Sequence, residues 1–117
     1  MKFYQKQFEK EAFNIIQEAL FAAGIRIAIA VNEDGTPHDP LKESFNNIGK
    51  EYMANNGTVA QQEEFVRRGY SILMEGLFMD GIRLKMPELG SRDSSLLIKA
   101  ILEIGKRYKK LTEAELF

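Results

Sequence analysis

The sequence predicts a mainly α protein, built of two tandem helix–extended–helix repeats that form a pseudo-twofold four-helix domain. Two observations lead to this prediction. The chain matches itself when it is shifted by 57 residues, and each copy holds two stretches in which apolar residues recur at helical spacing. The repeats cover about residues 1–57 and 58–117, and we expect one domain because 117 residues can bury a single core.

The duplication is clearest in the first helical stretch of each copy. Nine of the 22 positions from residue 5 to residue 26 are identical to the residue 57 places later, where chance would give about one or two. These pairs are Gln5/Gln62, Phe8/Phe65, Ile15/Ile72, Glu18/Glu75, Leu20/Leu77, Phe21/Phe78, Gly24/Gly81, Ile25/Ile82 and Arg26/Arg83. A shift of 56 adds five identities in the second stretch: Leu41/Leu97, Ile48/Ile104, Gly49/Gly105, Lys50/Lys106 and Tyr52/Tyr108.

An apolar stripe predicts the first helix of each copy. Residues 8, 12, 15, 16, 19, 20 and 23 share one helical face, and residues 65–77 repeat the pattern. The stripe is small at two positions in both copies, Ala12/Gly69 and Ala19/Gly76. Small residues let helix backbones approach closely, although each glycine costs about 1 kcal/mol in a helix interior. We therefore expect these two helices to pack against each other along this seam.

The ends of the first helices carry local signals. Thr58 and Gln61 form a capping-box pattern at the start of the second copy. Gly24 and Gly81 stand where a helix end favours a left-handed residue, which glycine adopts without steric cost. The apolar residue after each glycine can fold back onto the last helical turn, as a Schellman ending requires.

Extended segments are predicted next. Residues 25–31 alternate between large apolar residues and arginine or alanine, and residues 82–86 repeat the alternation until Pro87 ends it. The two segments are candidates for a short two-stranded sheet across the pseudo-twofold axis. Taken alone, residues 25–31 would equally fit a continued helix, and the repeat favours the extended form.

The second helix of the first copy is predicted to start at Asp39 as N-cap, with Pro40 in its first turn. Its counterpart starts near Ser94 or Ser95, and a further short helical turn is expected from Thr112. The apolar stripes of the two helices are Leu41, Phe45, Ile48 and Tyr52, and Leu97, Ile101, Ile104 and Tyr108.

Composition excludes several classes of site. There is no cysteine and only one histidine, so disulfides, thiolate chemistry and multi-histidine metal sites are excluded. His38 lies near Asp34 and Asp39, but this loop has no counterpart in the second copy, and we expect no metal and no cofactor. No apolar run reaches the roughly 18 residues of a membrane span. We expect a cytoplasmic protein without membrane contact.

Charged residues that occur in both copies, where a core does not require them, form the first candidate site. Arg26, Arg83, Glu18 and Glu75 satisfy that condition. Two arginines near a pseudo-twofold axis could hold a small anionic, nucleotide-like ligand or a symmetric partner. The alternative is structural: Arg26 pairs with Glu75, and Arg83 with Glu18, as ion pairs between the repeats.

A basic patch is the second candidate site. Five basic residues and one acid lie within residues 99–110, although the whole chain has a formal charge of −1. The basic residues are Lys99, Lys106, Arg107, Lys109 and Lys110. They favour contact with nucleic-acid phosphates. The alternative is a solvated helix end, where cations are favoured in any case.

The leading functional hypothesis is a small binding or regulatory protein that acts through protein–protein contacts and can itself oligomerise. Apolar residues outside the stripes motivate it, namely Phe21, Phe78, Met74, Met79 and Phe117. The alternatives are nucleic-acid binding through the basic patch and anion binding at the repeat interface. No motif typical of an enzyme is present, so catalysis is not expected.

Overall fold

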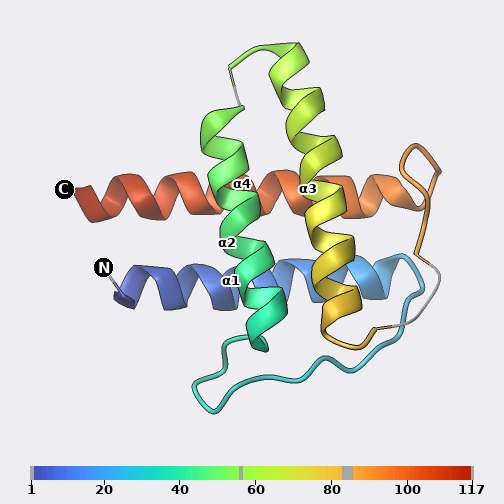
Figure 1. The fold of residues 1–117 in the computed structure, drawn as a ribbon, viewed down its shortest axis with the longest axis horizontal. Coiled ribbons are helices and arrows are strands. Elements are labelled where there is room, and N and C mark those ends of the chain that lie inside the picture. The colour runs from blue at the N-terminus through green and yellow to red at the C-terminus, as the bar shows by residue number, and fades with distance from the viewer. Residues whose placement is uncertain (1, 56, 83–85, 117) are drawn as a thin grey trace.

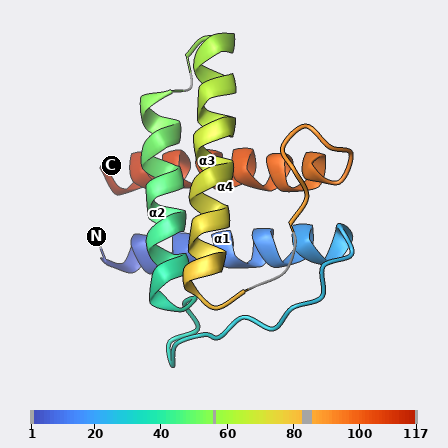
Figure 2. The ribbon, with the colours of Figure 1, turned by 45° about the vertical axis from the view of Figure 1, so that its right-hand side comes forward.

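Two antiparallel helix pairs, stacked crosswise as two layers, make up the fold (Figure 1). The computed structural model describes residues 2–55, 57–82 and 86–116, and within them the side chains of residues 5–113. The helices are α1 (Lys2–Ala22), α2 (Asp39–Ala54), α3 (Val59–Met79) and α4 (Ser94–Leu116). α1 lies beside α4 in one layer and α2 beside α3 in the other, as both views show (Figure 1, Figure 2). The predicted mainly helical, four-helix class is confirmed.

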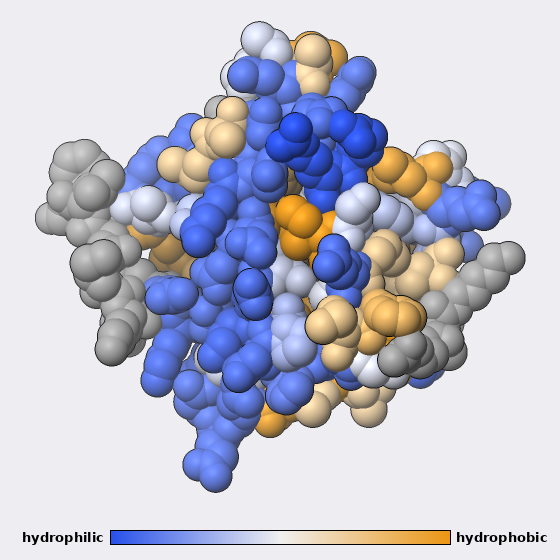
Figure 3. All heavy atoms as spheres, in the orientation of Figure 1, coloured by the Kyte–Doolittle hydropathy of each residue, from blue (hydrophilic) through white to orange (hydrophobic). Residues whose placement is uncertain are grey.

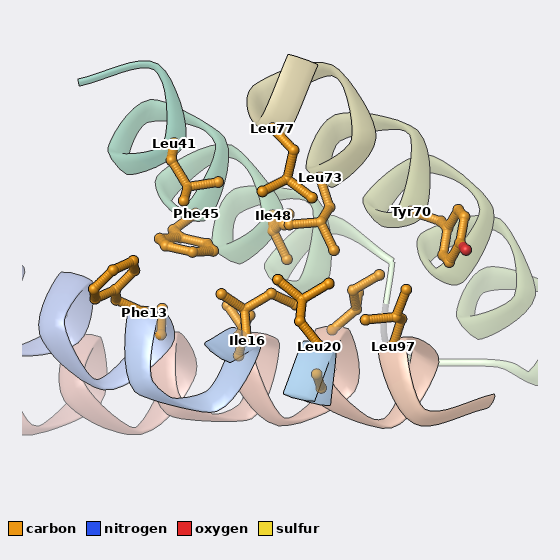
Figure 4. Close-up of a cluster of buried hydrophobic side chains, with 14 of the residues drawn as sticks. Phe13, Ile16, Leu20, Leu41, Phe45, Ile48, Tyr70, Leu73, Leu77 and Leu97 are labelled. Carbon is orange, nitrogen blue, oxygen red and sulfur yellow. The ribbon is translucent and has the colours of Figure 1, made fainter. Parts of the chain in front are cut away.

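The core lies between the two layers and draws equally on all four helices. Fully buried large side chains come in threes from each helix: Phe8, Ile16 and Leu20, then Leu41, Phe45 and Ile48, then Phe65, Leu73 and Leu77, then Leu97, Ile101 and Ile104. Figure 4 shows Ile16, Ile48 and Leu73 pointing toward one another across the layers. The shortest dimension of the molecule, 21 Å, matches two helices of about 10 Å diameter each.

The Schellman endings predicted at the two glycines are present. Gly24 has φ 83° and Gly81 has φ 91°, both in the left-handed region that side chains rarely adopt. The N–H of Ile25 donates to the carbonyl of Leu20 at 2.8 Å, and the second copy repeats this bond at 2.9 Å. Each first helix is therefore ended by its own local sequence.

Other helix boundaries follow the prediction in part. The capping box is confirmed, because Thr58 Oγ1 accepts from the N–H of Gln61 at 3.1 Å and Gln61 Oε1 accepts from the N–H of Thr58 at 3.0 Å. Asp39 is the first residue of α2 rather than its cap, which is His38. α4 continues through Thr112 to its end, so the separate short turn predicted there is wrong. None of the helices, over the residues described, has both the length and the apolar character needed to cross a membrane.

The layers approach most closely where α2 crosses α4, and glycines make this possible. A Cβ added to Gly49 would lie 2.2 Å from Cγ of Tyr108, and a Cβ added to Gly105 would lie 2.5 Å from Cγ of Tyr52. Each glycine thus receives the tyrosine ring of the other helix. The crossing accepts no larger residue at either position without a shift of the helices.

The predicted seam between the first helices of the two copies is wrong. No Cα of α1 comes within 8 Å of a Cα of α3 in the described residues. The small residues of α3 receive other helices: a Cβ on Gly69 would lie 2.8 Å from Cγ2 of Ile101 in α4, and one on Gly76 would lie 2.1 Å from Oγ of Ser44 in α2. The small residues of the stripe do mark places of close approach, but the helices that approach α3 there are α4 and α2.

Residues 25–31 are extended but do not form a strand. Ile25, Ile27 and Ile29 pack against the core while the side chains between them are exposed, which confirms the predicted alternation that far. Val31, the last large residue of the pattern, is exposed instead. Among the described residues there is no strand, and the segment makes only an isolated bridge between Val31 and Pro37. The partner segment proposed for a two-stranded sheet includes residues 83–85, which lie outside the described residues.

Candidate functional site

The four charged residues of the first candidate site are not gathered into one cleft where the structure describes them. The guanidinium of Arg26 lies over the ring of Phe21, 4.2 Å from its centroid, which is a cation–π contact. Glu18 and Glu75 are exposed, no ion pair joins Arg26 to Glu75 within the described residues, and Arg83 lies outside them. Arg26 lines a hollow of about 160 Å³, whereas Glu75 lines a separate one of about 440 Å³ together with two further carboxylates.

The basic patch is partly neutralised by carboxylates. Arg107 donates to Glu11 at 2.6 Å and to Glu103 at 3.2 Å, and the hydrogen bonds to Glu103 and then Glu11 raise the pKa of Arg107. Lys109 lies 3.9 Å from Glu113. The patch members that remain exposed, with no carboxylate within 4 Å among the described residues, are Lys99, Lys106 and Lys110.

His38 and Asp34, in the loop before α2, are both engaged by other side chains. His38 Nδ1 lies 2.6 Å from Oδ1 of Asp80 at the end of α3, so the histidine ties the loop to the other copy. Asp34 accepts from the hydroxyl of Thr36 at 2.6 Å and lies 3.3 Å from Nζ of Lys6, and the Thr36 bond lowers the pKa of Asp34 well below its usual range. No group of three potential ligands in the described part of the chain could hold a metal ion.

A groove between α3 and α4 is the most apolar hollow among the described pockets, with a volume of about 490 Å³. Its floor and walls are Val59, Gln62, Glu63, Val66, Arg67, Leu89, Gly90, Ile98 and Leu102. Two of its apolar side chains are open to solvent, since Val59 is 73% exposed and Leu89 is 44% exposed. Figure 3 shows hydrophobic surface to the right of the N-terminal half of α3, while the surface over α2 is largely hydrophilic.

Local sequence fixes the walls of this groove. The capping box at Thr58 places Val59 in the first turn of α3. Opposite it, the turn that carries Leu89 is held because the N–H of Gly90, whose φ is 96°, donates to Oγ of Ser94 at 3.1 Å. The same Oγ donates to the carbonyl of Ser91 at 2.7 Å. Both rims are thus ordered by hydrogen bonds that do not involve the apolar side chains between them.

The corresponding place in the first copy is polar. At the shifts of 57 and 56 residues, Val66 corresponds to Glu9 and Leu102 to Asn46. Glu9 is 4% exposed and accepts from Nδ2 of Asn46 at 2.8 Å. A buried carboxylate requires such a partner, because an unpaired one would be costly. The first copy thus satisfies polar groups internally where the second copy leaves an open apolar surface.

Sequence reasoning missed the groove, although a signal was present. Val66 and Leu102 stand where the shifts of 57 and 56 residues place Glu9 and Asn46, so polarity changes at these positions between two otherwise similar segments. Comparisons of the chain with family models, with curated proteins and with solved structures find no match. The functional proposal therefore rests on the residues of the chain itself.

Proposed function

We propose that this protein is a small binding protein that takes an amphipathic segment of a partner protein into the groove between α3 and α4. The observation that carries the proposal is the open apolar surface of Val59 and Leu89 above the partly buried Val66 and Leu102. Apolar surface left exposed beside ordered polar rims is typical of protein–protein contact sites. Grooves between two helices commonly receive the apolar face of a third helix.

We also infer that the chain is a single domain made of two fused copies related by a pseudo-twofold axis. In a twofold arrangement each contact between different residues occurs twice, with the partners exchanged. The ring of Phe8 lies 5.1 Å from that of Tyr108 at 78°, and the ring of Phe65 lies 5.2 Å from that of Tyr52 at 80°. These pairs exchange under the sequence shifts, as do the glycine–tyrosine contacts at the helix crossing, and both support the inference.

Duplication explains why the groove is the place to seek a specialised activity. Features that both copies share, such as the glycine endings and the helix crossing, support the fold. The groove differs between copies, because Glu9 and Asn46 are hydrogen-bonded to each other in the first copy, whereas the apolar Val66 and Leu102 stand at the corresponding positions of the second. The other two hypotheses have less support in the described residues, since Arg26 covers Phe21 and the basic patch is partly paired.

Selection from a random library of 16-residue peptides tests the proposal. The wild type is compared with the double variant Val59→Glu/Leu89→Glu, whose side chains are exposed, so that the core is untouched. Glutamate at Val59 also suits the positive N-terminus of α3. Val31→Glu, which changes an exposed apolar residue outside the groove, is the matched control.

We expect the wild type and Val31→Glu to enrich the same peptides, with apolar residues three or four positions apart, and the double variant to lose them. Circular dichroism and melting temperature establish that the variants are folded. If folded Val59→Glu/Leu89→Glu retains the peptides of the wild type, the groove is not the binding site and the proposal is wrong.

A further inference from the structure

Two lysines of α4 lie on the helix face next to Leu102, which lines the groove. Lys99 precedes Leu102 by three residues and Lys106 follows it by four, so all three lie on neighbouring positions of one helix face. Both lysines are exposed, and among the described residues neither has a carboxylate within 4 Å. Their charges are therefore available to whatever lies in the groove.

The α3 side of the groove carries charges of both signs, Glu63 and Arg67. Glu63 is exposed there, and the guanidinium of Arg67 is already engaged by the carboxylate of Glu64. The groove thus has an apolar floor, two lysines beside it on α4, and a rim on α3 that carries the exposed Glu63 and the carboxylate-paired Arg67. An occupant that complements it must be apolar along one stripe and acidic along the edge that faces α4.

We propose that the occupant is an amphipathic helical segment of a partner protein, with Asp or Glu along one side of its apolar stripe, facing Lys99 and Lys106. This inference rests on the proposed function and adds the charge and the orientation of the segment. Nucleic acid complements the groove less well. Among the described residues that line it none is aromatic, so no base could stack, and its floor offers apolar side chains where phosphates would need donors.

The peptides selected on the wild type give the first test. We expect Asp and Glu to outnumber Lys and Arg at positions next to the apolar stripe. The peptide that binds most tightly is then synthesised twice, once with the selected sequence and once with every Asp changed to Asn and every Glu to Gln. Binding of both peptides is measured by fluorescence polarisation at 50 mM and 500 mM salt.

The variant Lys99→Gln/Lys106→Gln gives the second test. We expect the Kd of the acidic peptide to rise about five-fold at 50 mM salt, because two exposed ion pairs are lost. The amide peptide should not distinguish the variant from the wild type, and the effect should shrink at 500 mM salt through screening. Lys50→Gln is the control, because Lys50 corresponds to Lys106 in the first copy and lies on α2, which contributes no residue to the groove lining.

Three results would overturn the inference, and each shows whether the proposed binding groove fails with it. If groove-dependent peptides are basic or uncharged, the groove still binds protein but the acidic class is wrong. A 20-nucleotide oligothymidylate is tested as well. If it binds the wild type, and if Lys99→Gln/Lys106→Gln raises its Kd by a larger factor than the Kd of the peptide, the lysines belong to a nucleic-acid site. If sedimentation shows a wild-type dimer that Val59→Glu/Leu89→Glu dissociates, the occupant is a second copy of the chain.

Discussion

Alanine at the helix crossing is a direct probe of the fold. In an ordinary helix Gly→Ala stabilises by about 1 kcal/mol, because alanine loses less backbone entropy on folding. Gly49→Ala should do the opposite here. The new Cβ would lie 2.2 Å from Cγ of Tyr108, whereas carbon atoms pack at about 3.5–4.0 Å, so α2 and the Tyr108 ring of α4 must move apart by roughly 1.3–1.8 Å.

The expected loss follows from the packing of that tyrosine. Overpacking a well-packed site costs about 1–3 kcal/mol, and displacement of the Tyr108 ring by the new Cβ also loosens its edge-to-face contact with Phe8. We expect a net destabilisation of about 2 kcal/mol after the helix-propensity gain. For a chain of this size that lowers the melting temperature by roughly 8 °C.

Thermal unfolding followed by circular dichroism measures this effect. Asn47→Ala, at an exposed position two residues earlier in α2, is the control and should leave the melting temperature unchanged or slightly raised. Gly105→Ala should also lower the melting temperature, because its Cβ would lie 2.5 Å from Cγ of Tyr52. A melting temperature raised by Gly49→Ala would refute the close crossing.

Three further predictions concern single hydrogen-bonding groups. Thr58→Ala removes the acceptor for the N–H of Gln61 and should cost about 1 kcal/mol in urea unfolding, and an unchanged midpoint would contradict the capping box. Tyr70→Phe removes the donor to the carbonyl of Pro87 and should also lower the free energy of unfolding by about 1 kcal/mol. A free energy of unfolding equal to that of the wild type within error would contradict this hydrogen bond. The two arginines after Glu64 on α3 hold its pKa at about 2, below the unfolded value of about 4.3. The contribution of the Glu64 carboxylate to stability is therefore complete above a pH of about 4.3 and is lost as the pH falls toward 2. Glu64→Gln should then reduce the fall of melting temperature with decreasing pH, and an unchanged fall would contradict the pairing.

Local features of the fold were predictable because their causes lie within a few residues. The capping box at Thr58 and the endings at Gly24 and Gly81 each depend on one turn of chain. The extended form of residues 25–31 was favoured over a continued helix because residues 82–86 repeat its alternation. The cap and the glycine endings specify a backbone conformation without reference to distant parts of the chain, whereas the extended form required the comparison of the two copies.

Partners across the fold were less predictable. Gly69 and Gly76 indicated that something approaches α3 closely, but a missing side chain does not identify what fills the space. The sequence likewise did not reveal that Arg26 stacks on Phe21, because a stacked and an ion-paired arginine have the same pattern in the chain. In the sequence, the groove was indicated only by a change of polarity between the copies at Val66 and Leu102. To recognise it, one must know that these two residues line the same groove.

The pairing of α1 with α4 has a consequence for synthesis on the ribosome. α1 lies beside α4, while its contacts with α2 are sparse and it has none with α3 in the described residues. At about 5–20 residues per second, roughly 4–14 s pass while the 71 residues between these two helices are made. Throughout that interval the apolar face of α1 lacks its main neighbour, so slower translation of the second half should increase aggregation of nascent chains without any change in the finished fold.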